Sequence, residues 1–133
     1  MACLLMNDVI AALALEANHP EKIATLRFAH AETILPAIAA MGMFQDKDPL
    51  VASMAFPKER MWKTSSIVPK AANLAFVSMD CRHPEGWQQQ RIAVWHNEVP
   101  AQIPICKDIL CTMAELEAAF GSCDYDDVCA LIK

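Results

Sequence analysis

The stretch from residue 23 to residue 42 constrains the fold of this chain most, because its hydrophobic pattern changes from strand to helix within a few residues. Residues 23–29 form a short apolar run, with Leu26 and Phe28 on one face, which predicts a buried strand. From Thr33 the apolar residues recur at helical spacing. The stretch therefore predicts a strand followed directly by a helix.

The ends of this predicted helix are marked by a proline and a glycine. Pro36 falls in the first turn of a helix that starts at Thr33, where its missing N–H costs nothing. Gly42 can end the helix in a left-handed conformation.

The junction between the predicted strand and helix holds His30, Ala31 and Glu32. Ligands of open α/β sheets bind at the carboxyl ends of the strands. A helix N-terminus at that place adds free N–H donors and a partial positive charge, which favour phosphate. An imidazole and a carboxyl group at such a junction are candidates for a catalytic pair.

The sequence H-A-E fits the H-x-E of the zinc deaminases, in which it supplies a metal ligand and a proton shuttle. That signature also requires a P-C-x-x-C sequence, which this chain does not contain. Cys106 and Cys111 come nearest, but four residues separate them and no proline precedes them. A zinc deaminase is therefore a remote alternative, and we expect no metal site.

Residues 26–50, LRFAHAETILPAIAAMGMFQDKDPL, resemble the segment around the proton donor of the multiple inositol polyphosphate phosphatases, a family of histidine-type acid phosphatases. The resemblance continues through IVPKAANLAFVSMDC and RIAVWHNE, at 67–81 and 91–98. Members of this family carry H-A-E where other histidine acid phosphatases carry H-D. The resemblance implies an α/β fold, in which residues 1–133 are the C-terminal part of one histidine phosphatase domain, an α/β sandwich.

The resemblance also implies a chemistry. These enzymes transfer a phosphoryl group to a histidine and then to water, and they act on inositol polyphosphates such as phytate, and some on 2,3-bisphosphoglycerate. At the matching positions Glu32 is the proton donor and His30 contacts the transferred phosphoryl group. Thr33 can cap the helix or touch phosphate. No metal or organic cofactor is implied.

The nucleophile of that chemistry lies in an N-terminal R-H-G-x-R-x-P motif, which these 133 residues do not contain. The one Arg-His pair, Arg82-His83, is followed by Pro84 where the motif has glycine, and it comes after H-A-E. We therefore expect this chain to need the N-terminal part of the same enzyme and to be inactive alone. The alternative is a non-catalytic, disulfide-stapled secretory domain that binds a partner or a polyphosphate.

The charge pattern narrows the possible ligands. A net charge of −5 argues against general nucleic-acid binding, and no apolar run is long enough for a membrane span. One basic cluster, made by Lys58, Arg60, Lys63 and Lys70, stands out in this acidic chain. It is either a solvated face or, through Lys63 and Lys70, the border of a pocket for a phosphorylated small molecule.

The six cysteines suggest an oxidising compartment, although no signal peptide is visible at the start of the chain. The family resemblance implies the secretory pathway, either the endoplasmic reticulum lumen or the exterior. Two disulfides that close short loops are predicted, Cys106–Cys111 and Cys123–Cys129. The remaining two cysteines, at positions 3 and 81, either pair with each other or require partners outside the chain.

Three further elements are predicted from local patterns. Residues 3–17 carry apolar residues four apart, as on the buried stripe of a helix. Residues 72–79 and 90–98 alternate as two strands of an antiparallel hairpin. Thr112 and Glu115 form the capping box of a short C-terminal helix.

Overall fold

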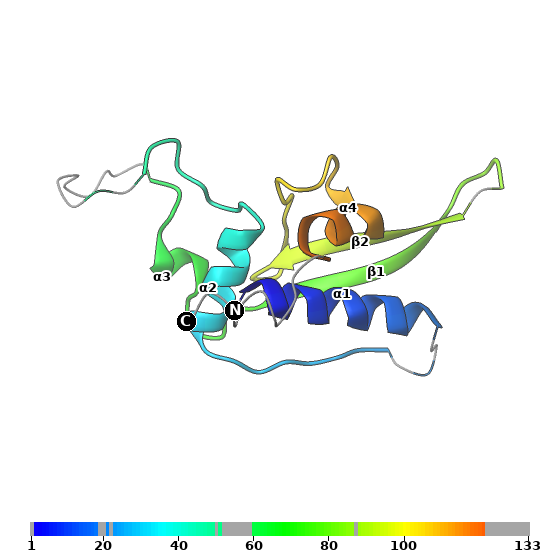
Figure 1. The fold of residues 1–133 in the computed structure, drawn as a ribbon, viewed down its shortest axis with the longest axis horizontal. Helices are drawn as coiled ribbons and strands as arrows, with labels where there is room; N and C mark the ends of the chain where they lie inside the picture. Colours follow the sequence, from blue (N-terminus) through cyan, green and yellow to red (C-terminus); the bar gives the residue numbers. More distant parts are fainter. Residues whose placement is uncertain are drawn as a thin grey trace, which may run out of the picture.

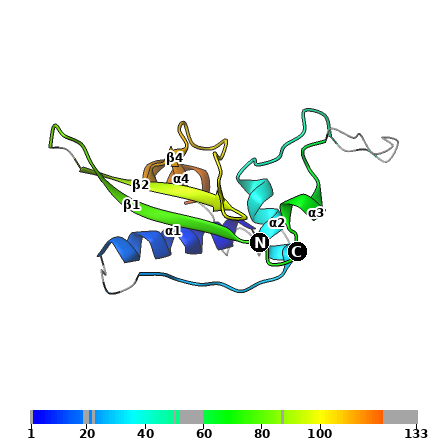
Figure 2. The ribbon, with the colours of Figure 1, turned by 180° about the vertical axis from the view of Figure 1, so that it is seen from behind.

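Helices cover one face of a small antiparallel sheet (Figures 1 and 2). The computed structural model describes residues 2–18, 21, 23–49, 51, 60–86 and 88–121. The elements in chain order are α1 (Ala2–Asn18), α2 (Ala31–Ala40), α3 (Thr64–Ile67), β1 (Leu74–Arg82), β2 (Gln88–His96), β3 (Val99–Pro100), β4 (Leu110–Cys111) and α4 (Met113–Phe120). None of the helices in these ranges has the length and apolarity needed to cross a membrane.

Helix α1 confirms the predicted N-terminal helix and contributes one side of the hydrophobic core. Met6, Ile10 and Leu13 recur at helical spacing and are buried. They join a hydrophobic cluster that also contains Ile38 of α2 and Leu116 of α4. Helix α1 therefore packs against both α2 and α4. Of these two, α2 is the helix that begins at the H-A-E junction.

The predicted hairpin is confirmed as strands β1 and β2, which pair antiparallel from Leu74 opposite His96 to Arg82 opposite Gln88. Strand β1 is one residue longer than predicted, β2 has the predicted length but begins and ends two residues earlier, and the connection between them is shorter. Two short strands, β3 and β4, also pair with β2 and were not predicted. Strand β2 is thus the centre of the sheet, whereas β1 pairs with β2 alone.

Helix α4 begins as the capping box predicts. The N–H of Glu115 donates to the hydroxyl oxygen of Thr112, and the carboxylate of Glu115 accepts from the N–H of Thr112. The same carboxylate accepts from the N–H of Lys107 at 3.1 Å, which ties the preceding loop to the helix. Leu116 and Phe120 are buried, and Gly121 is the C-cap.

The disulfide predictions are confirmed in one case and corrected in another. Cys106 and Cys111 are disulfide-bonded, and they bracket the loop that leads into β4. Cys3 is disulfide-bonded whereas Cys81 is free, so these two do not pair with each other. The predicted Cys123–Cys129 bridge lies outside the described residues.

The strand predicted at residues 23–29 does not form. The segment is extended, but it belongs to no sheet among the described residues, and its apolar side chains are exposed. Ile23 is 93% exposed, Leu26 77% and Phe28 93%. A strand, unlike a helix, exists only when a neighbour accepts and donates its backbone hydrogen bonds, and no described strand lies beside this one.

Helix α2 begins two residues earlier than predicted, at Ala31 rather than Thr33. Glu32 therefore lies inside its first turn. Pro36 is the sixth helical residue and not a first-turn proline, so its ring and missing N–H interrupt the hydrogen-bond ladder.

The C-terminus of α2 confirms the role predicted for Gly42, which has a φ of +73°. The N–H of Gly42 donates to the carbonyl of Ala39 at 2.9 Å, and the N–H of Met43 donates to the carbonyl of Ile38 at 3.2 Å. These two bonds form a Schellman motif, which satisfies carbonyls that the helix end leaves unpaired.

Candidate functional site

The structure places the H-A-E residues at the N-terminus of α2. His30 is the N-cap, with φ −90° and ψ 170°, and its side chain makes no capping hydrogen bond. Its carbonyl accepts from the N–H of Thr33 at 2.9 Å. The side chains of His30 and Glu32 are exposed, and that of Thr33 is half-buried. The three predicted site residues therefore lie within one helical turn.

This helix end is suited to an anion. The first N–H groups of a helix have no intrahelical partner, and they carry the positive end of the helix dipole. Glu32 is the acidic residue of the first turn. Within the part of the chain that the structure describes, the side chains of His30 and Glu32 make no hydrogen bond or ion pair. An imidazole and a carboxyl group are thus presented to an external ligand.

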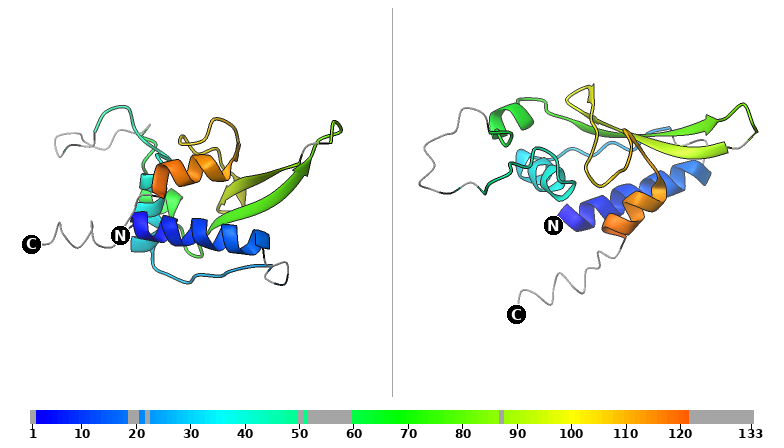
Figure 3. Two further views of the ribbon diagram at one scale, coloured as in Figure 1. Left: turned by 45° about the vertical axis from the view of Figure 1, so that its right-hand side comes forward. Right: turned by 90° about the horizontal axis from the view of Figure 1, so that it is seen from above.

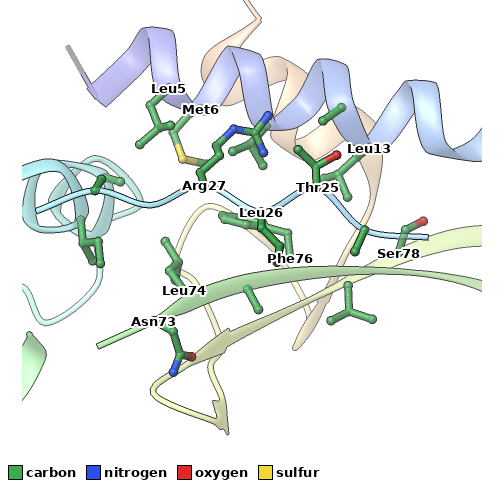
Figure 4. Close-up of a pocket in the computed structure, with 18 of the residues that line it drawn as sticks. Leu5, Met6, Leu13, Thr25, Leu26, Arg27, Asn73, Leu74, Phe76 and Ser78 are labelled. Atoms are coloured by element: carbon green, nitrogen blue, oxygen red, sulfur yellow. The ribbon is translucent and has the colours of Figure 1, made fainter. Parts of the chain in front are cut away.

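A groove borders this helix end (Figure 4). It lies between α1, the extended segment 23–29 and β1, and its volume is about 1230 Å³. Thr33 lines one part of it, and residues 71–73 line another. Lys70 is exposed and immediately precedes that lining segment. Neither Lys70 nor Lys63 lines this groove, and Lys70 is connected to it only as the residue that precedes the lining segment 71–73.

Lys63 belongs to a different arrangement, which is centred on Asp46. The carboxylate of Asp46 accepts hydrogen bonds from the N–H groups of Met61 at 2.6 Å and Trp62 at 3.1 Å. The bond from Met61, then that from Trp62, and the nearby charges of Arg60 and Lys63 lower the pKa of this carboxyl below its ordinary value of 3.8. Asp46 thus fixes the loop before α3, a role that its polar turn did not reveal.

One cysteine pair bears on the zinc deaminase alternative. Cys106 and Cys111, the cysteines nearest to a deaminase pattern, are joined in a disulfide and are not available as metal ligands. Among the described residues, no three histidine, cysteine, aspartate or glutamate side chains are close enough to hold a metal ion. Lys58, the first residue of the basic cluster, lies outside the described residues.

Arg27 anchors the segment that ends at His30, and sequence analysis did not assign it a role. Its Nε donates to Oδ2 of Asp8 on α1 at 2.7 Å, and its terminal nitrogen lies 2.7 Å from the same oxygen. Figure 4 shows Arg27 directed toward α1. The signal in the sequence is that Arg27 is the one charged residue in the run 23–29.

Comparison with known proteins agrees with the resemblance that the sequence suggested. The model of the family described as histidine phosphatase superfamily (branch 2) matches residues 1–97. A multiple inositol polyphosphate phosphatase 1 from Dictyostelium discoideum is 35% identical over 106 residues, which are 77% of this chain and 16% of that protein. The protein of that name from Gallus gallus is 29% identical over 143 positions, covering 99% of this chain and 32% of the relative.

The Homo sapiens protein of the same name is 31% identical over 114 residues, which are 81% of this chain and 23% of the relative. The chain thus spans between about a sixth and a third of the length of these relatives. No solved structure matches this chain. The family match favours the phosphatase interpretation of H-A-E over the zinc deaminase interpretation.

Proposed function

Because this chain belongs to branch 2 of the histidine phosphatase superfamily, we propose that it is part of a phosphatase that hydrolyses phosphomonoesters of inositol polyphosphates, phytate-like substrates included. The substrate class is taken from the names of its three relatives, which are multiple inositol polyphosphate phosphatases. 2,3-Bisphosphoglycerate is a second possible substrate of the same chemical kind, since it also carries clustered phosphomonoesters.

The observation that carries this proposal is the exposed pair His30 and Glu32 at the N-terminus of α2. A phosphate placed there meets unpaired N–H groups and the positive end of the helix dipole. It would also have an imidazole on one side and a carboxyl group on the other. We propose that Thr33, in the same turn and bordering the groove, contacts the phosphate as well.

The proposed reaction has two steps. A histidine nucleophile attacks phosphorus, the ester P–O bond breaks, and the departing alkoxide takes the proton of Glu32. Water then attacks the phosphorus of the phosphohistidine, the P–N bond breaks and frees the histidine, and inorganic phosphate leaves, with Glu32 accepting the proton of that water. His30 contacts the phosphoryl group during both transfers. A general acid in the role of Glu32 typically contributes roughly 10²–10⁴-fold to the rate.

The nucleophile of this scheme is not among these 133 residues, which contain no R-H-G-x-R-x-P sequence. We therefore propose that residues 1–133 are the C-terminal part of one histidine phosphatase domain. The nucleophile and the phosphate-binding arginines come from its N-terminal part. By itself the chain should have no appreciable phosphatase activity, because no phosphohistidine can form at the proposed site.

Lys70 and Lys63 are proposed contacts for the further phosphates of a polyphosphate. The support for Lys70 is that it is exposed and directly precedes residues 71–73, which line the groove that Thr33 borders. Lys63 has weaker support, since its charge already lies near Asp46. The disulfide Cys106–Cys111 supports an oxidising compartment for the enzyme, and we propose the secretory pathway.

The test is a chimera in which this chain replaces the matching third of the Gallus gallus relative. In this chimera Glu32→Gln keeps shape and hydrogen bonding but removes the proton. Hydrolysis of phytate should slow by about 10²-fold or more. p-Nitrophenyl phosphate, whose leaving group needs little protonation, should be affected much less. Glu117→Gln, an identical change at an exposed position of α4, should affect neither substrate.

Equal losses on both substrates would contradict the proton-donor role of Glu32 and leave it a structural or phosphate-site residue. A chimera that binds phytate without hydrolysing it, while the parent relative is active, would favour the alternative function. In that case the chain is a disulfide-stapled domain that binds a polyphosphate or a partner.

A further inference from the structure

The turn that carries Lys70 has a strained backbone. The N–H of Ala72 donates to the carbonyl of Pro69 at 3.1 Å, which closes a β-turn with Lys70 and Ala71 at its centre. Ala71 has a φ of +62°, a left-handed value that has a steric cost for alanine and none for glycine. A residue persists in such a conformation only where the surrounding structure imposes it. Contacts outside this turn must therefore hold it in place.

One side chain, that of Asn97, holds the chain on both sides of the turn. Its amide nitrogen donates to the carbonyl of Ile67 at 3.1 Å, and its amide oxygen accepts from the N–H of Asn73 at 3.1 Å. The orientation of the amide is fixed, because a backbone N–H only donates and a carbonyl only accepts. The backbone N–H of Asn97 also donates to the carbonyl of Asn73 at 3.0 Å. These contacts, which we call the Asn97 bridge, close a loop of residues 67–73 with Lys70 at its centre.

The Asn97 bridge starts from a rigid part of the fold. Asn97 and Glu98 are the two residues between β2 and β3, and their φ values are +49° and +67°. A two-residue hairpin loop with positive φ at both positions is of type I′, which favours asparagine because this residue tolerates the left-handed conformation. The loop ends β2, the central strand of the sheet, so the backbone that directs the amide of Asn97 is itself held by strand pairing.

The bridge is also fixed relative to helix α2. His96 is buried, and its Nε2 lies 2.7 Å from the same carbonyl of Ile67 that Asn97 contacts. Its ring packs against that of Phe44, which follows α2, with the ring centroids 5.3 Å apart. Helix α3, which ends at Ile67, accordingly lies beside α2 in the views of Figures 1 and 3. The loop that carries Lys70 therefore has a defined position relative to the helix that begins at the H-A-E junction.

The side chain of Lys70 is available to a ligand. It is exposed and makes no hydrogen bond or ion pair within the part of the chain that the structure describes. Residues 71–73, directly after it, line the same groove as Thr33 of α2. The charges of Arg60 and Lys63, in contrast, lie near Asp46. A cation that a fixed turn already holds in position loses less conformational freedom on binding an anion than a cation on a mobile loop does.

We propose that Asn97 is a positioning residue for substrate specificity, which holds Lys70 where this lysine contacts a phosphate group other than the one being hydrolysed. The inference rests on the proposed function and deepens it, because such a contact exists only with a substrate that carries several phosphates. Asn97 itself touches no substrate and acts through Lys70. Since the contact is remote from the breaking P–O bond, it strengthens the binding of substrate and transition state equally and so changes KM rather than kcat.

The test is steady-state kinetics of the chimera with the Gallus gallus relative, in which the ratio of KM for phytate to KM for p-nitrophenyl phosphate is measured. p-Nitrophenyl phosphate carries a single phosphate. Asn97→Gly keeps the left-handed backbone and removes the amide, and it should raise this ratio about two- to tenfold, the cost of ordering a long side chain on binding. The kcat for phytate should not fall. Lys70→Met should raise the same ratio about tenfold or more through loss of a charged contact.

Glu98→Gly is the matched control for Asn97→Gly. Glu98 also has a positive φ, is exposed, and makes no side-chain hydrogen bond with any described residue. Its replacement should not raise the KM ratio. The Asn97→Gly chimera should fold, because the carbonyl of Ile67 keeps its contact with His96 and the N–H of the exposed Asn73 can bind water.

A double-mutant cycle separates positioning from a general structural role. In a Lys70→Met background, Asn97→Gly should no longer change the KM ratio, because the side chain that it positions is gone. An equal effect of Asn97→Gly with and without Lys70 would overturn the proposal, as would a lower kcat for both substrates at an unchanged ratio. An unchanged ratio in Lys70→Met alone would also overturn it, and this exposed substitution does not depend on the folding of the Asn97 variant.

The outcomes separate this inference from the proposed function. Hydrolysis that depends on Glu32, with a KM ratio that depends on neither Lys70 nor Asn97, would keep the function and reject the positioning role. If the chimera does not hydrolyse phytate, the same variants are compared by the Kd of phytate in isothermal titration calorimetry. Binding that Asn97→Gly weakens only when Lys70 is present would then keep the positioning role and reject the function. A chimera that does not bind phytate would overturn both.

Discussion

Replacement of Pro36 by alanine should stabilise this chain, because the structure places this proline inside α2. It is the sixth residue of the helix Ala31–Ala40, and its side chain is exposed, so its replacement changes no core packing. A proline there cannot donate to the carbonyl of Glu32 four residues earlier, and its ring crowds that carbonyl. Alanine restores the hydrogen bond and removes the crowding.

The expected magnitude follows from two opposing contributions. Proline in a helix interior costs about 3 kcal/mol relative to alanine. Proline also restricts the unfolded chain, which favours the native state by about 0.4–1 kcal/mol and is lost in Pro36→Ala. The difference is a stabilisation of about 2 kcal/mol, or a rise in Tm of roughly 8–16 °C for a domain of about 100 residues.

The assay is urea unfolding followed by circular dichroism at a helical wavelength, with Pro69→Ala as the matched control. Pro69 lies between α3 and β1, outside every described helix and strand. Its replacement should therefore lower stability by about 0.4–1 kcal/mol, because only the effect on the unfolded chain remains. Reduced or unchanged stability of Pro36→Ala would refute the reasoning, since the proline would then not disturb the helix.

Three further predictions concern the end of the chain that holds α4. Thr112→Ala should lower the free energy of unfolding by about 1 kcal/mol through loss of the N-cap, and Thr112→Ser should be nearly neutral in the same urea assay. The N–H of Thr112 lowers the pKa of Glu115 from 4.5, so the stability that Glu115 contributes is present above pH 4.5 and lost as the pH falls through its folded-state pKa. The free energy of unfolding should thus change less between about pH 6 and about pH 3 in Glu115→Gln than in the control Glu117→Gln. Replacement of both Cys106 and Cys111 by serine should cost about 2 kcal/mol, the loop-closure value for a bridge this short, as measured against the oxidised parent.

Elements whose hydrogen bonds are local were determined by the sequence alone. The capping box of Thr112 and Glu115 satisfies its own donors within one turn, and Gly42 supplies the left-handed conformation that ends α2. The hairpin was equally predictable, because its two strands are neighbours in the chain and alternate in the same register. The motif at residues 30–32 indicated the family for a similar reason, since it is read from consecutive residues.

The tertiary structure decided everything that depends on a partner distant in sequence. β3 and β4 exist because β2 offers them an edge, and Asp46 acquires its role from N–H groups some 15 residues away. Residues 23–29 have the composition of a strand, yet they form none among the described residues, because a strand cannot satisfy its backbone groups internally as a helix does. Whether an apolar run becomes a strand is therefore decided by the chain beside it, and here that neighbour was not predictable from the run itself.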